Sequence, residues 1–179
     1  NVYAPLKHTT SLTTSCKRPY KMSIDNFEFV RQLGVGKSST VFMVRDKKTG
    51  AMASLKCIKK EHVHRENMLG QLIREVKIGS FCRHPNIITL YGIFDDSESF
   101  YLLSELGCDG QLYNKLKRVG NFSEEATAFI VRQVLEAVTY LHEHSIYHRD
   151  IKPENIVLSH VRTTHYLGNR QVVRLWMVS

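Results

Sequence analysis

Residues 148–155, which read His-Arg-Asp-Ile-Lys-Pro-Glu-Asn, constrain this chain more than any other segment. They combine a candidate base, Asp150, with a lysine that can reach a phosphate, Lys152, and an amide that can reach a metal ion, Asn155. Such a loop can act only if the fold brings a phosphate-binding surface to it. The segment therefore predicts a loop for phosphoryl transfer and requires that partners upstream converge on it.

A glycine-rich segment lies upstream between two predicted strands. Gly34 and Gly36 begin the pattern G-x-G-x-x-G-x-V, which ends at Val41 and is met except at its third glycine, Ser39. Apolar residues alternate before the glycines, and a β-branched and aromatic run at 41–44 follows them, which predicts a strand on each side. Glycine lets backbone N–H groups approach a phosphate closely, so we expect this hairpin to cover phosphates.

Residues 36–38 also match the end of a different nucleotide-binding pattern, the Walker A loop G-x-x-x-x-G-K-[ST]. Its first glycine would have to be residue 31, which is Arg31. A Walker loop also begins a helix, whereas residues 40–42 favour a strand. The P-loop interpretation therefore fails.

Two charged residues of opposite sign follow. Lys56 lies in the middle of a short apolar strand at 52–58 that is similar to the V-A-I-K strand. Glu75 lies at the edge of an apolar helical stripe formed by residues 69, 72, 73 and 76. A solvent-facing lysine is the ordinary alternative, but we expect Glu75 to face the sheet and hold Lys56 extended toward phosphates.

A long helix is predicted just before residues 148–155. Ser123 is a good N-cap, and the two acids that follow suit the positive end of the helix dipole. The helix carries one apolar stripe, which predicts burial: Ile130, Val134, Val138 and Leu141.

The histidines near the end of this helix suggest a zinc site. His142 and Glu143 begin the pattern H-E-x-x-H, but its second histidine would be residue 146, which is Ile146. The zinc interpretation therefore fails, and His148 is expected to support the backbone of the loop.

Taken in this order, these segments resemble the eukaryotic protein kinase family over about residues 25–160. Within the family the chain is most similar to the Aurora serine/threonine kinases, through residues 26–28, 74–76, 83–87 and 90–92. The resemblance implies an α+β, two-lobed fold. It also implies that the small lobe, a twisted antiparallel sheet plus one helix, is complete and that the helical large lobe is truncated after the catalytic loop.

The resemblance also implies an organisation of the chain. Residues 1–24 form a basic leader that is expected to be disordered or fragmentary. Residues 25–104 correspond to the small lobe, and residues 105–160 to the hinge and the start of the large lobe with the catalytic loop. Residues 161–179 remain as a tail outside the family pattern.

By position, the resemblance implies that ATP and Mg²⁺ are the cofactors. Asp150 would orient the attacking hydroxyl, Lys152 would offset charge on the γ-phosphate, and Asn155 would hold magnesium. Ser104 would stand at the back of the nucleotide pocket. The implied nucleotide-binding residues are Leu33, Gly34, Gly36, Val41, Ala53, Lys56, Glu75, Glu105, Gly107 and Asn155.

One part of the family pattern is not met. Family spacing places the Asp-Phe-Gly segment, with a second magnesium ligand, near position 168, which is Gly168. Resemblance and acidic residues both stop near residue 160, so we expect residues 161–179 to derive from a shifted reading frame, a retained intron or an alternative exon. This chain is therefore expected to be inactive or nearly so.

Composition adds little that is specific. Residues 1–24 and 161–179 carry four and three basic residues without an acid, and the remaining 18 basic and 17 acidic residues nearly cancel. The net charge of +8 therefore does not indicate a nucleic-acid-binding face. No apolar run reaches membrane-spanning length, and four scattered cysteines are typical of reduced thiols in the cytosol or nucleus.

The sequence as a whole predicts a serine/threonine kinase that transfers the γ-phosphate of ATP to protein hydroxyls. Protein substrates and an activating protein are the partners that the resemblance implies, with no nucleic acid and no membrane. The resemblance also implies a location in the nucleus and cytoplasm, with association with the spindle or chromosomes. The alternative is a catalytically dead nucleotide-binding or scaffold protein that acts by interaction.

Overall fold

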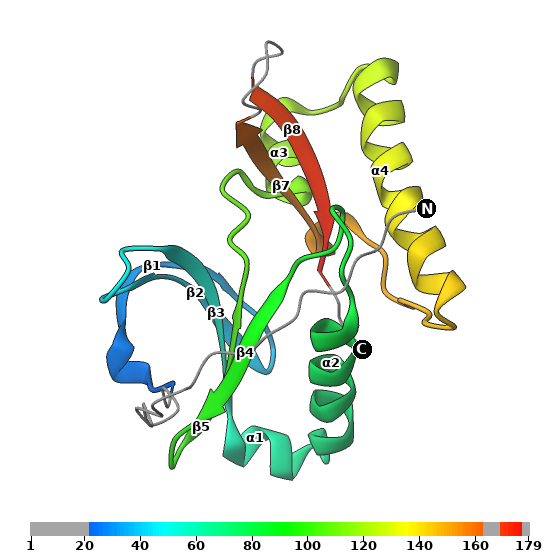
Figure 1. Ribbon diagram of the computed structural model, residues 1–179. Helices are drawn as coiled ribbons and strands as arrows, with labels where there is room; N and C mark the ends of the chain where they lie inside the picture. The colour runs from blue at the N-terminus through cyan, green and yellow to red at the C-terminus, as the bar shows by residue number, and fades with distance from the viewer. Residues whose placement is uncertain (1–21, 163–168, 177–179) are drawn as a thin grey trace, which may run out of the picture.

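The computed structural model describes residues 22–162 and 169–176 (Figure 1). One lobe is a five-stranded antiparallel sheet in the order β1-β2-β3-β5-β4. The 3-10 helix η1 (Ile24–Asn26) precedes the sheet, and two helices follow its third strand. The elements are β1 (Phe27–Val35), β2 (Ser39–Asp46), β3 (Met52–Lys59), α1 (Lys60–Arg65), α2 (Leu69–Phe81), β4 (Leu90–Asp95) and β5 (Ser99–Ser104).

This small lobe confirms the predicted antiparallel sheet with a packed helix. Its sheet has a core on each side because apolar side chains alternate along the strands. On one side Phe27, Phe94 and Tyr101 stack among buried aliphatic residues, and on the other Leu72 of α2 packs against Leu102. The short helix α1 is an addition that the sequence did not predict.

The second lobe contains two helices and a three-stranded sheet in the order β6-β7-β8 (Figure 1). The N-cap of its longer helix is as predicted, because Ser123 Oγ accepts a hydrogen bond of 3.2 Å from the Ala126 amide. The elements are β6 (Gly110–Gln111), α3 (Leu112–Val119), α4 (Glu124–Glu143), the 3-10 helix η2 (Pro153–Asn155), β7 (Ile156–Arg162) and β8 (Asn169–Leu175).

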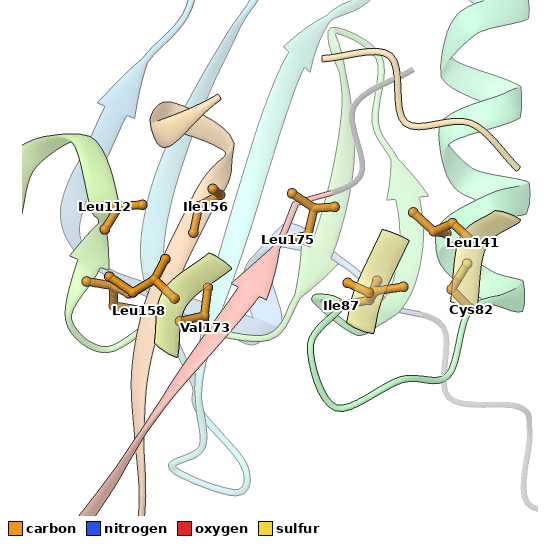
Figure 2. Packing of buried hydrophobic residues seen from close by; sticks show 10 residues of the cluster. Cys82, Ile87, Leu112, Leu141, Ile156, Leu158, Val173 and Leu175 are labelled. Atoms are coloured by element: carbon orange, nitrogen blue, oxygen red, sulfur yellow. The ribbon is translucent and has the colours of Figure 1, made fainter. Parts of the chain in front are cut away.

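The apolar stripe of α4 is covered within this lobe. Ile130 and Leu141 are buried, and Val134 and Val138 pack against the same cluster. Figure 2 shows that side chains from both lobes and from β7 and β8 complete this core, among them Cys82, Ile87, Leu158, Val173 and Leu175. The exposed apolar side chains of α4 are instead Phe129, Val131 and Leu135, on a different face of the helix.

Residues 169–176 are part of this fold. β8 pairs with β7 from Arg162↔Asn169 to Ile156↔Leu175, so it runs back toward the start of β7. Val173 and Leu175 are almost fully buried. Residues 169–176 therefore contribute to the core of the large lobe, while the predicted origin of the tail outside the family stays a prediction.

The linker between α2 and β4 joins the lobes. The buried Asn86 donates from Nδ2 to Gln133 Oε1 of α4 at 3.0 Å and to the Val173 carbonyl of β8 at 2.8 Å. The Leu175 amide donates to the Asn86 carbonyl, and the Ile88 amide donates to the Leu175 carbonyl. Because buried polar groups must be hydrogen-bonded, this linker is held to β8.

The hinge between β5 and β6 passes very close to β7. A Cβ atom placed on Gly107 would lie 1.8 Å from Val157 Cγ1 and 3.0 Å from its Cβ. Only a residue without a side chain allows this approach.

In the described part of the chain, no helix has the length and apolar character needed to cross a membrane.

The close approach predicts the effect of a methyl group at the hinge. Gly107→Ala should lower the free energy of unfolding by about 1–3 kcal/mol through overpacking, measured by chemical denaturation. Gly107→Ala with Val157→Ala should regain much of the loss. Gly34→Ala is the control, because a Cβ there would meet nothing within 4 Å. Equal effects of Gly107→Ala and Gly34→Ala would contradict the packing argument.

Candidate active site

A cavity of about 540 Å³ lies between the two lobes. The small lobe contributes the β1–β2 hairpin and β3, and the large lobe contributes residues 150–157 and Trp176. The cavity thus brings together residues that are more than a hundred positions apart in the sequence. The predicted site residues that line it are Leu33, Gly34, Gly36, Val41, Lys56, Glu105, Gly107, Asp150, Lys152 and Asn155.

Glu75 does not line this cavity but reaches it through Lys56. Its Oε1 atom lies 2.7 Å from Lys56 Nζ, and the two side chains are 10% and 14% exposed. Glu75 is buried because it shares the inward face of α2 with Leu72 and Gly79. A buried ion pair of this kind contributes more to geometry than to stability, and it directs the ammonium toward the cavity.

Two other predicted residues lie behind the cavity wall. Ala53 is buried in the small-lobe core beside Val44 and Leu103, so its contact with a nucleotide stays a prediction. Ser104 is 2% exposed and borders a second cavity of about 20 Å³, which Glu75 and Trp176 also line.

The carboxylate of Asp150 is held by two neighbours in its own loop. Asp150 Oδ2 accepts from Lys152 Nζ at 2.9 Å and from Asn155 Nδ2 at 2.8 Å. The hydrogen bond from Lys152 is the main reason that the pKa of Asp150 lies below its ordinary value, and Asn155 acts in the same direction. The carboxylate is therefore ionised at neutral pH and available as a hydrogen-bond acceptor.

The backbone of the loop depends on His148, which is buried. Its Nδ1 atom accepts from the Asp150 amide at 3.3 Å, and its Nε2 atom lies 2.7 Å from the Trp176 carbonyl, to which it donates. These partners assign a neutral tautomer with the proton on Nε2. Arg149, between His148 and Asp150, adopts a φ of 62°, a left-handed backbone conformation.

The side-chain amide of Asn155 is held by Asp150. Its Nδ2 atom donates to the carbonyl and to the carboxylate of Asp150, both at 2.8 Å, which leaves Oδ1 as an acceptor. An amide oxygen beside a carboxylate suits Mg²⁺, which takes oxygen ligands and keeps several waters or phosphate oxygens. Within residues 22–162 and 169–176, no cluster of three or more His, Cys, Asp or Glu side chains could hold a metal by itself. The Asn155 side-chain oxygen suits a metal that is shared with a phosphate ligand.

The structure adds Trp176, which the sequence analysis missed. Its amide donates to the Asn155 carbonyl at 2.9 Å, its carbonyl is bound by His148, and it lines both cavities. Family spacing pointed instead to Gly168, which lies outside the described residues. The pairing of β8 with β7 ends at Ile156↔Leu175, so Trp176, the next residue, lies at the cavity.

Comparison with known proteins gives a consistent result. The protein kinase domain family matches residues 27–169. The chain is 40% identical over 150 residues to Aurora kinase B of Mus musculus, which covers 84% of this chain and 43% of that protein. It is 43% identical over 136 residues to an Aurora kinase of Yarrowia lipolytica, covering 76% of this chain and 37% of that protein. The chain thus spans less than half the length of these curated relatives.

The hydrogen bond from Lys152 predicts a measurable titration. Lys152→Met should raise the pKa of Asp150, because it removes the largest stabilisation of the carboxylate. The carboxylate would then become protonated at a higher pH, which ¹³C NMR of the Asp150 carboxyl carbon can follow. Lys117→Met, which removes the same charge from α3, is the control. An unchanged titration of Asp150 in Lys152→Met would contradict the assigned role of the lysine.

Proposed function

This chain belongs to the protein kinase family, and we propose that it forms the nucleotide-binding part of an Aurora-like serine/threonine kinase. The reaction is transfer of the γ-phosphate of ATP to Ser or Thr hydroxyls of protein substrates. Protein kinases generally use ATP with Mg²⁺. The observation that carries the proposal is that Lys56 and Asp150 face one cavity from opposite lobes.

In this proposal the small lobe binds the triphosphate. The Lys56 ammonium, held by Glu75, would contact the phosphates, and the backbone of the β1–β2 hairpin at Gly34 and Gly36 would lie over them. The adenine would reach the backbone of the hinge near Glu105 and Gly107, which line the same cavity. Together these groups position the γ-phosphate toward the catalytic loop.

The large lobe would position the acceptor hydroxyl. A carboxylate with a lowered pKa is a weak base, so Asp150 would mainly orient the hydroxyl and accept its proton as the transfer proceeds. Lys152 would offset charge on the transferred group, and Asn155 would hold magnesium through its Oδ1 atom. Magnesium, when bound, neutralises charge on the β- and γ-phosphate oxygens. Catalysis would thus rest on positioning and electrostatics.

One observation favours a second function. β8 delivers Trp176 to the cavity, and an indole cannot supply a metal ligand there. A chain with Asn155 as its main magnesium contact would bind nucleotide more readily than it would transfer phosphate. The alternative is therefore a nucleotide-binding protein that acts by interaction without catalysis.

Binding is tested through the single tryptophan of the chain. Titration with magnesium-ATP should change the fluorescence of Trp176, because this residue lines the cavity. Lys56→Met should weaken binding by roughly tenfold or more, since a charge-assisted contact to phosphate is lost. Lys59→Met is the control, because that lysine lies on the same strand in an exposed pair with Glu98. Equal affinities for the two variants would contradict the proposed site.

Transfer separates the two functions. We expect phosphate incorporation into a general protein substrate by a form extended with a kinase large lobe, measured with radiolabelled ATP. Asp150→Asn should lower the rate by about 10²–10⁴-fold while nucleotide affinity is kept. Tight binding with no transfer, by both the extended form and this chain, would favour the scaffold function.

A further inference from the structure

We propose that the ion pair between Arg174 of β8 and Glu105 of the hinge, here called the hinge ion pair, is a positioning contact that sets nucleotide affinity. This proposal rests on the proposed function for its nucleotide readout. Neither residue was assigned this role by the sequence, in which Glu105 was expected to be a nucleotide-binding residue and Arg174 belonged to the tail.

The hinge ion pair is a direct and largely buried contact. Arg174 Nη1 donates to Glu105 Oε2 at 2.5 Å, and the two side chains are 16% and 21% exposed. Glu105 follows β5 directly and lines the nucleotide cavity, whereas Arg174 lies two residues before Trp176. The pair therefore ties the strand that enters the site to the segment expected to bind adenine.

The linker between α2 and β4 is hydrogen-bonded to Glu105 as well. The Glu105 amide donates to the Thr89 carbonyl at 2.9 Å, and the Thr89 amide donates to Glu105 Oε2 at 3.5 Å. One residue earlier, the Ile88 amide donates to the Leu175 carbonyl of β8. Three segments, the hinge, the linker and β8, thus meet at one carboxylate. The position of that carboxylate constrains the backbone of the hinge.

The energetics favour a role in geometry. The Arg174 side chain donates to Glu105 through Nη1. In the described part of the chain, Arg174 Nε is buried without a hydrogen-bond partner. Loss of the Glu105 charge would leave a guanidinium mostly buried and unpaired, which is costly. The chain would then move the hinge, β8 or both to hydrate that charge. Because the adenine-binding backbone lies on the hinge, such a movement weakens nucleotide binding.

The experiment is a double-mutant cycle in the full chain with Glu105→Gln and Arg174→Met. Each single variant should weaken magnesium-ATP binding by about tenfold. The double variant should lose no more affinity than either single variant. Arg174→Lys, which keeps the charge, should recover most of the affinity. Arg132→Met and Glu136→Gln are the matched control, because that pair is exposed and should show no coupling.

A second measurement requires no nucleotide. Hydrogen exchange of the Glu105 amide should speed up by about tenfold in each single variant, because its bond to Thr89 opens more often. Suppose that the Glu105 amide exchanges faster in the variants but that no form of the chain, wild type included, binds magnesium-ATP. This result would contradict the proposed function and would still support the hinge ion pair as a positioning contact. If exchange of the Glu105 amide is unchanged and the two substitutions have additive effects on magnesium-ATP affinity, the proposed role of the hinge ion pair is wrong. If Glu105→Gln does not fold, Arg174→Met and Arg174→Lys decide the question by the same two readouts.

Discussion

The arrangement of the lobes depends on the hydrogen bonds between β8 and the linker that connects α2 to β4. Asn86 is buried, and its side-chain Nδ2 donates to one group from α4 and to one from β8. Leu175 then exchanges backbone hydrogen bonds with Asn86 and Ile88. Since each unpaired buried polar group would be costly, the small lobe cannot turn away from the large lobe without breaking several contacts at once. The cavity exists because these contacts bring its two walls together.

Within this frame the charges of Lys56 and Asp150 are already paired. Glu75 directs Lys56, and Lys152 with Asn155 holds the Asp150 carboxylate in its ionised form. Preorganised charges of this kind need little rearrangement when a charged ligand arrives. His148 connects this network to the end of β8 through the Trp176 carbonyl, so the same strand supports the lobe contact, the catalytic loop and the hinge.

Local patterns predicted much of this structure. The glycine-rich hairpin, the lysine strand, the α2 helix with Glu75 on its inner face and the N-cap of α4 at Ser123 all follow from spacing and residue type. The same patterns did not separate Ala53, which lies in the core, from residues that line the cavity. They gave no role to Trp176, because the pairing of β8 with β7 cannot be read from family spacing.

The sequence by itself determined which residues carry charge and where the glycine-rich hairpin, the lysine strand, α2 and α4 form, because periodicity and turn chemistry act between neighbours in the chain. It did not determine the roles of Trp176 and Arg174, which look like part of an unrelated tail. Only the pairing of β8 with β7, and the packing of Val173 and Leu175 in the core, bring these two side chains to the cavity and the hinge. Such roles depend on contacts between residues far apart in sequence, which burial and backbone pairing decide in three dimensions.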